Sequence, residues 1–210
     1  MTTEDALQGQ WRQLRERLQG RQLLGKDGAS LSLRIPGRDA MWFGCGPEAA
    51  PQRVPLRAAA GASEVHAAVY AARGDVGAVA VGGAEFGCCL ADFGGAMPQV
   101  FDEQARHLGH MGPAVSDAEY IARSLGKGGN VLLSQGRPVC LGMTTTRLAL
   151  NAELFEKCAK AYVLALASGA RVKPLPWWVR AIANSRLHKD ERRAAQAFAR
   201  GELPIESRGY

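Results

Sequence analysis

The first part of the chain changes from a helical to an alternating pattern of apolar residues. Between residues 5 and 20 apolar side chains recur every three or four positions, which predicts an amphipathic helix. Residues 30–35 then alternate polar and apolar side chains, and this pattern predicts a half-buried strand. Residues 40–44 follow a Pro-Gly turn and are expected to form its hairpin partner. The helical apolar set is Leu7, Trp11, Leu14 and Leu18.

A second helix and a second strand are predicted further along the chain. Ser63 precedes a helical stretch over residues 64–73, and Gly74 is placed to end it. Residues 76–81 read VGAVAV, a continuous apolar run of strand length, which indicates a strand buried on both faces. That strand leads directly into glycines and small residues rather than into polar side chains.

The second half of the chain continues the alternation of helices and strands. Ser116, with Glu119 three residues later, predicts a capped helix over residues 116–129. The region from residue 44 to residue 62 has no clear period and is interpreted as a long connection. The other predicted helices cover residues 84–93, 100–109 and 147–169, and the other strands cover 130–135 and 138–142. This order, with at least one hairpin, predicts an α/β fold with a mixed sheet.

The sequence KPLP at residues 173–176 marks the expected boundary between two parts of the chain. We expect residues 1–175 to form the main domain and residues 176–210 to form a basic helical C-terminal extension. Within this extension, Asp190 and Glu191 are expected to pair with neighbouring basic residues of the same helix. The adjacent Trp177 and Trp178 are expected to pack against the main domain or against a neighbouring subunit.

Composition and charge narrow the possible functions. The chain has 210 residues, 47% of them hydrophobic, which is enough for one large domain with a core. Its formal net charge of +6 fits a basic surface or an anionic partner. Neither a secretory signal nor an apolar run long enough for a membrane span is recognised, and a nucleic-acid partner is not expected. Five cysteines without CxxC spacing are typical of a reduced, cytoplasmic protein.

Five segments, in this order and spacing, resemble the class II aldolase/adducin family. They lie between about residues 8 and 170 and read GKDGASLSLR, SEVHAAVYAARGDVGAVAV, FDEQARHLG, GGNVLLSQGRPVCLG and FEKCAKAYVLALASG. The resemblance implies a three-layer α/β/α fold around a central mixed sheet. It also implies a homo-oligomer, a tetramer with sites at subunit interfaces.

The family resemblance also implies a divalent metal, usually zinc, held by three histidines and acting as a Lewis acid. In this chain those three positions fall on Val81, Gly83 and Gln135. Zinc takes imidazole, thiolate or carboxylate ligands, and one neutral amide oxygen does not replace them. We therefore expect no zinc and no other cofactor at this place.

A substitute metal site would have to use two histidines and two adjacent cysteines. His107 and His110 are three residues apart, and Cys88 and Cys89 precede them. Their spacing matches no zinc signature, so core packing and a helix end are the preferred interpretations.

The resemblance places a catalytic carboxylate near the start of the second helix. The family's glutamate stands four residues before the helix histidine, a position that falls on Ala62 without a gap. Glu64 stands two residues before His66 and matches only if two residues are deleted there. Its alternative role is that of an acid that stabilises the helix N-terminus. His66 itself is expected to fill a helix–sheet contact rather than to act as a base.

A small anionic ligand is expected near the first hairpin. The family's phosphate region is partly preserved in this chain, and a glycine-rich turn can present backbone N–H groups to an anion. An ordinary hairpin is the alternative. The substrate-binding candidates are Lys26, Ser30, Ser32, Gly44, Gly46 and Gln135, with Arg34 also retained from the family pattern.

Two functions follow from the resemblance. The first is a non-catalytic binding or assembly protein, a pseudo-enzyme, because the lost metal removes the electrophile that would stabilise an anionic intermediate. The alternative is a zinc-independent lyase, epimerase or dehydratase acting on a small anionic carbonyl compound or sugar phosphate. Glu64, Ser32 and Arg34 keep this alternative open.

Overall fold

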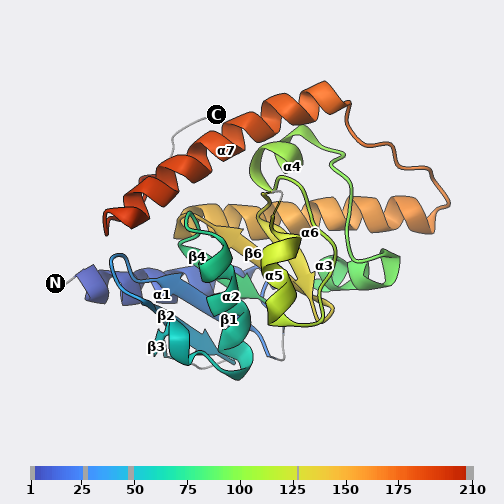
Figure 1. The fold of residues 1–210 in the computed structure, drawn as a ribbon. Coiled ribbons are helices and arrows are strands. Elements are labelled where there is room, and N and C mark those ends of the chain that lie inside the picture. The colour runs from blue at the N-terminus through green and yellow to red at the C-terminus, as the bar shows by residue number, and fades with distance from the viewer. Residues whose placement is uncertain (1–2, 26–27, 47–49, 127, 207–210) are drawn as a thin grey trace.

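A six-stranded sheet forms the centre of the computed structural model, which describes residues 3–25, 28–46, 50–126 and 128–206. The strand order is β3-β2-β1-β4-β6-β5, so β1 and β4 are central (Figure 1). The strands are β1 (Ser30–Arg34), β2 (Ala40–Cys45), β3 (Gln52–Pro55), β4 (Ala78–Val81), β5 (Val131–Ser134) and β6 (Arg137–Gly142).

The five pairs of neighbouring strands are antiparallel. A parallel element is added at the edge, where Val115 forms a bridge with Ser134 of β5. The short edge strand β3 lies inside the region from residue 44 to residue 62, for which the sequence predicts only an irregular connection. The pairing of β1 with β4 places Ser30 directly opposite Val81, so the ends of the two central strands meet.

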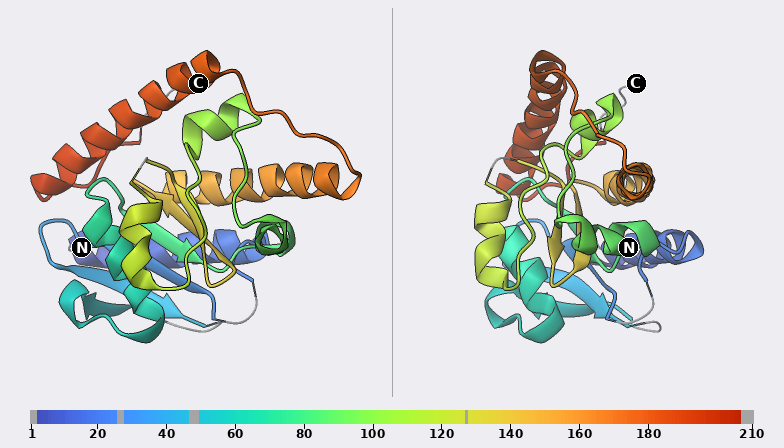
Figure 2. Two further views of the ribbon diagram at one scale, coloured as in Figure 1. Left: turned by 45° about the vertical axis from the view of Figure 1, so that its right-hand side comes forward. Right: turned by 90° about the vertical axis from the view of Figure 1, so that its right-hand side faces the viewer.

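Helices cover both faces of the sheet, which gives three layers (Figure 2). One face carries α1 (Thr3–Gly20), α3 (Glu85–Cys89) and α6 (Thr145–Ala167), and the other carries α2 (Glu64–Ala72) and α5 (Ile121–Ser124). The predicted three-layer α/β/α class is thereby confirmed. Short 3-10 helices complete the connections: η1 (Leu56–Ala58), η2 (Gly61–Ser63), η3 (Leu90–Phe93) and η4 (Ala118–Tyr120).

Two apolar cores, one on each face, follow from the alternation of side chains along the strands. The four predicted apolar residues of α1 are buried with Leu31 and Leu33 of β1. Val79 and Val81 of β4 point to the opposite face and pack with Val69 of α2. The continuous apolar run in β4 thus serves both cores, as the sequence predicted.

The segment before β5 differs from its prediction. Ser116 does not cap a helix there, because its hydroxyl donates to the carboxylate of Asp117 at 2.6 Å. Helical structure begins only at η4 and continues into the four-residue helix α5. As a result, Asp117 precedes η4 and Glu119 lies within it, and both stand close to the first turn of α2.

The C-terminal helix α7 (Trp177–Ala199) lies across α4 (Asp102–His107) at the top of the molecule in Figure 1. Asp190 and Glu191 are buried and face the body of the protein rather than solvent. Glu191 accepts from Arg73 at 2.8 Å, and Asp190 accepts from Arg106 at 2.9 Å. Glu191 also pairs with His188, and Asp190 with Arg193, so the expected pairs within the helix are present. The contacts with Arg73 and Arg106 in addition anchor α7 to the rest of the chain.

The start of α7 is open to solvent. Trp177 is 74% exposed and Trp178 is 55% exposed, so more than half of each residue is in contact with solvent. Among the described residues, no helix is both long enough and apolar enough to cross a membrane.

Candidate functional site

A cavity of about 720 Å³ opens beside the first turn of α2, and we name it the α2 pocket. Its floor includes Ser30 and Val81, the paired ends of β1 and β4. The fold therefore gathers three of the predicted site positions, Glu64, Ser30 and Gln135, around Val81. The lining residues are Gly28, Ser30, Gly61, Ala62, Glu64, Val65, Val81, Asp117, Ala118, Glu119, Ser134, Gln135 and Arg137.

Gly82 and Gly83, in contrast, lie against neighbouring residues and do not line this pocket. A Cβ atom added to Gly83 would lie 2.3 Å from Cγ of Pro138, and one added to Gly82 would lie 2.0 Å from the carbonyl oxygen of Leu24. The backbone φ is +149° at Gly82 and +86° at Gly83. A side chain at either position would meet both steric overlap and backbone strain. Neighbouring residues therefore occupy the space that a side chain at either position would need.

Gln135 occupies the tight turn between β5 and β6. Its φ is +51°, its side chain is exposed, and its backbone N–H donates to the carbonyl oxygen of Val115 at 2.9 Å. The turn thus holds Gln135 at the edge of the pocket, where its amide offers one donor and one acceptor group.

The donor set at this place does not fit a zinc ion. Val81 supplies only carbon, Gly83 supplies no side chain, and Gln135 supplies one neutral amide. Across the described ranges no cluster of three or more His, Cys, Asp or Glu side chains with metal-binding geometry is found. The set of His107, His110, Cys88 and Cys89 therefore forms no such cluster, and Nδ1 of His107 contacts Arg147 at 2.6 Å instead.

A chain of hydrogen-bonded polar groups lies beneath the floor of the α2 pocket. Ser30 Oγ contacts His66 Nε2 at 2.8 Å, and His66 Nδ1 contacts Ser32 Oγ at 2.8 Å. Ser32 Oγ in turn contacts the Tyr70 hydroxyl at 2.8 Å. His66 has no exposed surface, and burial lowers its pKa to about 3. The expected helix–sheet contact of His66 is confirmed, since its ring joins α2 to β1.

Carboxylates mark the outer edge of the α2 pocket. Glu64 is exposed in the first turn of α2, and its Oε1 accepts from the backbone N–H of Gly61 at 3.2 Å. This bond fits the helix-stabilising alternative, although the same side chain lines the pocket. Glu119 approaches from η4, Asp117 from the residue before it, and Arg137 from the start of β6. Sequence reasoning missed these three residues. Around Glu119 it predicted one long capped helix, whereas the structure has the short helices η4 and α5 there.

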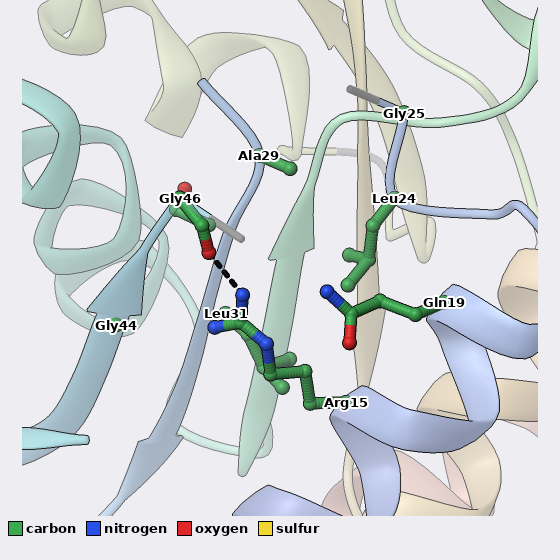
Figure 3. A pocket seen from close by; sticks show the side chains of 9 residues that line it. Arg15, Gln19, Leu24, Gly25, Ala29, Leu31, Gly44 and Gly46 are labelled. Atoms are coloured by element: carbon green, nitrogen blue, oxygen red, sulfur yellow. Dashed lines mark hydrogen bonds between the residues drawn. The ribbon is translucent and has the colours of Figure 1, made fainter. Parts of the chain in front are cut away.

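A second cavity of about 270 Å³ lies on the α1 side of the sheet, and we name it the α1 pocket. Figure 3 shows Arg15 and Gln19 reaching toward it from α1. The guanidinium of Arg15 donates to the carbonyl oxygen of Gly46, and burial lowers its pKa. Ser30 lines both cavities. The complete lining consists of Arg15, Gln19, Leu24, Gly25, Ala29, Ser30, Leu31, Gly44 and Gly46.

The predicted glycine turn therefore lies at the α1 pocket. The N–H of Gly46 donates to the carbonyl of Ala29 at 2.9 Å, so it belongs to the hairpin. Arg15 supplies the positive charge that sequence reasoning did not assign. A signal was present, since Arg15 follows Trp11 by four positions and therefore falls on the buried face of the helix.

The remaining predicted residues lie elsewhere. Ser32 is fully buried behind Ser30 and lines neither pocket. Arg34 stands at the far end of β1, where its guanidinium donates to the carbonyl oxygens of Gly74 and Tyr70 and stacks on the ring of Phe198. Lys26 lies outside the described residues.

Comparisons with solved structures show which fold this is. The chain resembles YgbL from Escherichia coli, a candidate aldolase/epimerase/decarboxylase, at 16% identity and a TM-score of 0.73, covering 87% of this chain and all of that one. It also resembles an L-fuculose 1-phosphate aldolase, at 16% identity and a TM-score of 0.72, over 90% of this chain and 98% of that one. An aldolase II superfamily protein from Pseudomonas syringae matches at 14% identity, with a TM-score of 0.67, over 92% and 90%.

The fold is thus class II aldolase-like. At these identities the comparison establishes the fold alone. No protein-family model matches the chain. No curated protein matches it either.

Proposed function

We propose that this protein is a non-catalytic binding protein, a pseudo-enzyme on the class II aldolase fold, whose ligand is a small hydroxy or carbonyl compound. The observation that carries the proposal is the lack of metal-binding side chains at Val81, the last residue of β4, and at the two glycines that follow it. The two glycines leave no room for side chains, and Val81 presents carbon to the pocket. A zinc-dependent reaction needs ligands that these positions do not offer.

The binding part of the proposal is supported by the two cavities that share Ser30. The α2 pocket is large enough for a small organic molecule, and its polar groups come from several separate strands and helices. The α1 pocket, where Arg15 supplies positive charge, is suited to a separate small anion.

The second candidate function is a zinc-independent lyase, epimerase or dehydratase. The observation that favours it is the position of Glu64, whose carboxylate lines the same cavity as Ser30 and Gln135. A carboxylate beside a bound carbonyl compound is the usual proton-transfer group of such reactions.

Assembly and location are also part of the proposal. We propose a homo-oligomer, with a tetramer as the first arrangement to test by light scattering. The exposed Trp177 and Trp178 support a further contact, because large apolar side chains at a surface often mark an interface. The five cysteines are free thiols, which supports a cytoplasmic location.

The deciding experiment couples elemental analysis to a ligand screen. Purified protein is analysed for zinc, and its melting temperature is then measured with sugar phosphates, hydroxy acids and uncharged hydroxycarbonyl compounds. We expect less than a stoichiometric amount of metal and stabilisation by at least one compound. One zinc per chain that is lost in Gln135→Ala would overturn the metal-free proposal, and no stabilisation by any compound would overturn the binding role.

A further inference from the structure

The hydrogen bonds from Tyr70 through Ser32 and His66 to Ser30 must all run in the same direction, because each of these groups has few hydrogen-bond partners. His66 is fully buried, and burial lowers its pKa to about 3, so the ring is neutral near pH 7. A neutral imidazole has one N–H and one lone pair. One of its two serine neighbours must therefore donate to the ring, while the other accepts from it.

The Tyr70 end of the chain decides which serine donates. Tyr70 is 3% exposed, and within the described part of the protein its hydroxyl has Ser32 as its hydrogen-bond partner. A buried hydroxyl hydrogen requires an acceptor, so Tyr70 donates to Ser32. Ser32 has one hydrogen, which then goes to Nδ1 of His66. The ring proton consequently lies on Nε2 and points to Ser30.

This direction leaves the hydrogen of Ser30 pointing away from the ring. Ser30 is 3% exposed and lines the pocket, and its Oγ has His66 as its side-chain partner among the residues described. We infer that the Ser30 hydroxyl is a fixed hydrogen-bond donor to the molecule bound in the α2 pocket, and that His66, as its Nε2–H tautomer, is the positioning residue. The ligand part of this inference rests on the proposed binding function.

The groups around Ser30 define the class of ligand. A donor on the floor requires an acceptor oxygen on the ligand, such as a carbonyl oxygen. Glu64, Asp117 and Glu119 at the edge accept hydrogen bonds from hydroxyl groups and repel a phosphate dianion. The α2 pocket is therefore suited to an uncharged hydroxycarbonyl compound, with its carbonyl oxygen against Ser30.

The first test needs no ligand. The ¹⁵N spectrum of the histidine side chains distinguishes the two neutral tautomers, and the His66 signal is assigned by its loss in His66→Gln. We expect the Nε2–H tautomer at pH 7, without protonation down to about pH 4. The Nδ1–H tautomer would mean that these hydrogen bonds run in the opposite direction, and it would overturn the inference about Ser30.

The second test separates positioning from packing. Dihydroxyacetone is titrated while the methyl signals of Val81, on the pocket floor, are followed. We expect Ser30→Ala and His66→Met to weaken binding about tenfold, the effect of one lost hydrogen bond. His66→Gln keeps an amide N–H facing Ser30 and should stay within about threefold. Ser124→Ala, which removes a buried serine hydroxyl elsewhere, is the matched control and should bind like the wild type.

The outcomes are distinct. Equal binding by the Gln and Met variants would show that His66 only fills space, which overturns its positioning role. If dihydroxyacetone leaves Val81 unchanged while another compound of the screen shifts it, the assigned ligand class is wrong and the binding function stands. If no compound shifts Val81, the ligand role of Ser30 fails together with the binding function.

Discussion

The two pockets on either side of Ser30 have opposite chemical characters. The α2 pocket carries Glu64, Asp117 and Glu119 against one guanidinium from Arg137, whereas the α1 pocket has Arg15 as the ionised group among its described lining residues. The comparison shows a cavity with hydrogen-bonding groups on one side of the sheet and a cavity with one cationic side chain on the other.

The largest expected effect concerns Gly83, which follows the end of β4. Gly83→Ala should destabilise the protein by about 2–5 kcal/mol, because positive φ costs roughly 1–2 kcal/mol and overlap with Pro138 adds about 1–3 kcal/mol. Gly94→Ala is the matched control, since Gly94 has a similar φ of 90° but no neighbouring atom within 4 Å of the place that its Cβ would take. Urea unfolding of both variants measures the difference. Equal losses of stability in the two variants would mean that Pro138 moves aside at little cost and that position 83 can accept a side chain.

Acid should destabilise the α2 side. Unfolded His66 has an ordinary pKa of 6.5, but burial lowers the folded value to about 3, so between these pH values only the unfolded state binds the proton. The free energy of unfolding should therefore fall by about 1.4 kcal/mol for each pH unit below about 6.5. The groups facing the ring are uncharged: Ser30, Ser32 and Phe43.

Urea unfolding of the wild type and of His66→Gln at pH 7, 6 and 5 checks this prediction. The variant should lose the part of the pH dependence of the free energy of unfolding that is due to His66. His107→Gln is the comparison variant, because burial and the neighbouring Arg147 lower the pKa of His107 to about 4, away from both pockets. An unchanged slope in His66→Gln would show that His66 is protonated with little cost in the folded protein.

The α1 pocket should respond to anions. Inorganic phosphate is expected to raise the melting temperature of the wild type, and Arg15→Met should weaken that binding about tenfold by removing a charge-assisted donor. Glu119→Gln at the α2 pocket should leave phosphate binding unchanged or slightly stronger. Calorimetry of the three proteins gives the affinities. Phosphate binding that is lost in Glu119→Gln but kept in Arg15→Met would reverse the assignment of the two pockets.

The patterns within single elements predicted the fold well. The spacing of Trp11 and Leu14 predicted α1, and the alternation around Leu31 predicted β1, because local periodicity records which face of an element is buried. The edge strand β3 was missed, since its short sequence between two prolines carries no alternation. The antiparallel pairing of the neighbouring strands depends on the course of the whole chain, which periodicity does not record.

The candidate site was predicted only in part, for the same reason. Glu64, Ser30 and Gln135 line one cavity, and their roles there stay predictions. The closure of Gly83 depends on Pro138, and the chain beneath Ser30 depends on His66, each a contact between segments far apart in sequence. Likewise, Glu191 pairs with His188 within α7, as spacing predicted, but its contact with Arg73 joins segments far apart in sequence.

The smallest expected effect belongs to Glu64, and it decides between the two functions of the α2 pocket. If Glu64 serves the helix N-terminus, Glu64→Gln should cost about 0.3–1 kcal/mol of stability, because its bond to Gly61 is exposed and an amide oxygen still accepts from that N–H. Binding of dihydroxyacetone should then change little. Glu119→Gln is the matched control for removing one carboxylate from the pocket edge. If a compound of the screen is turned over and Glu64→Gln slows that reaction more than about hundredfold while Glu119→Gln does not, Glu64 is the proton-transfer group and the pocket is an active site.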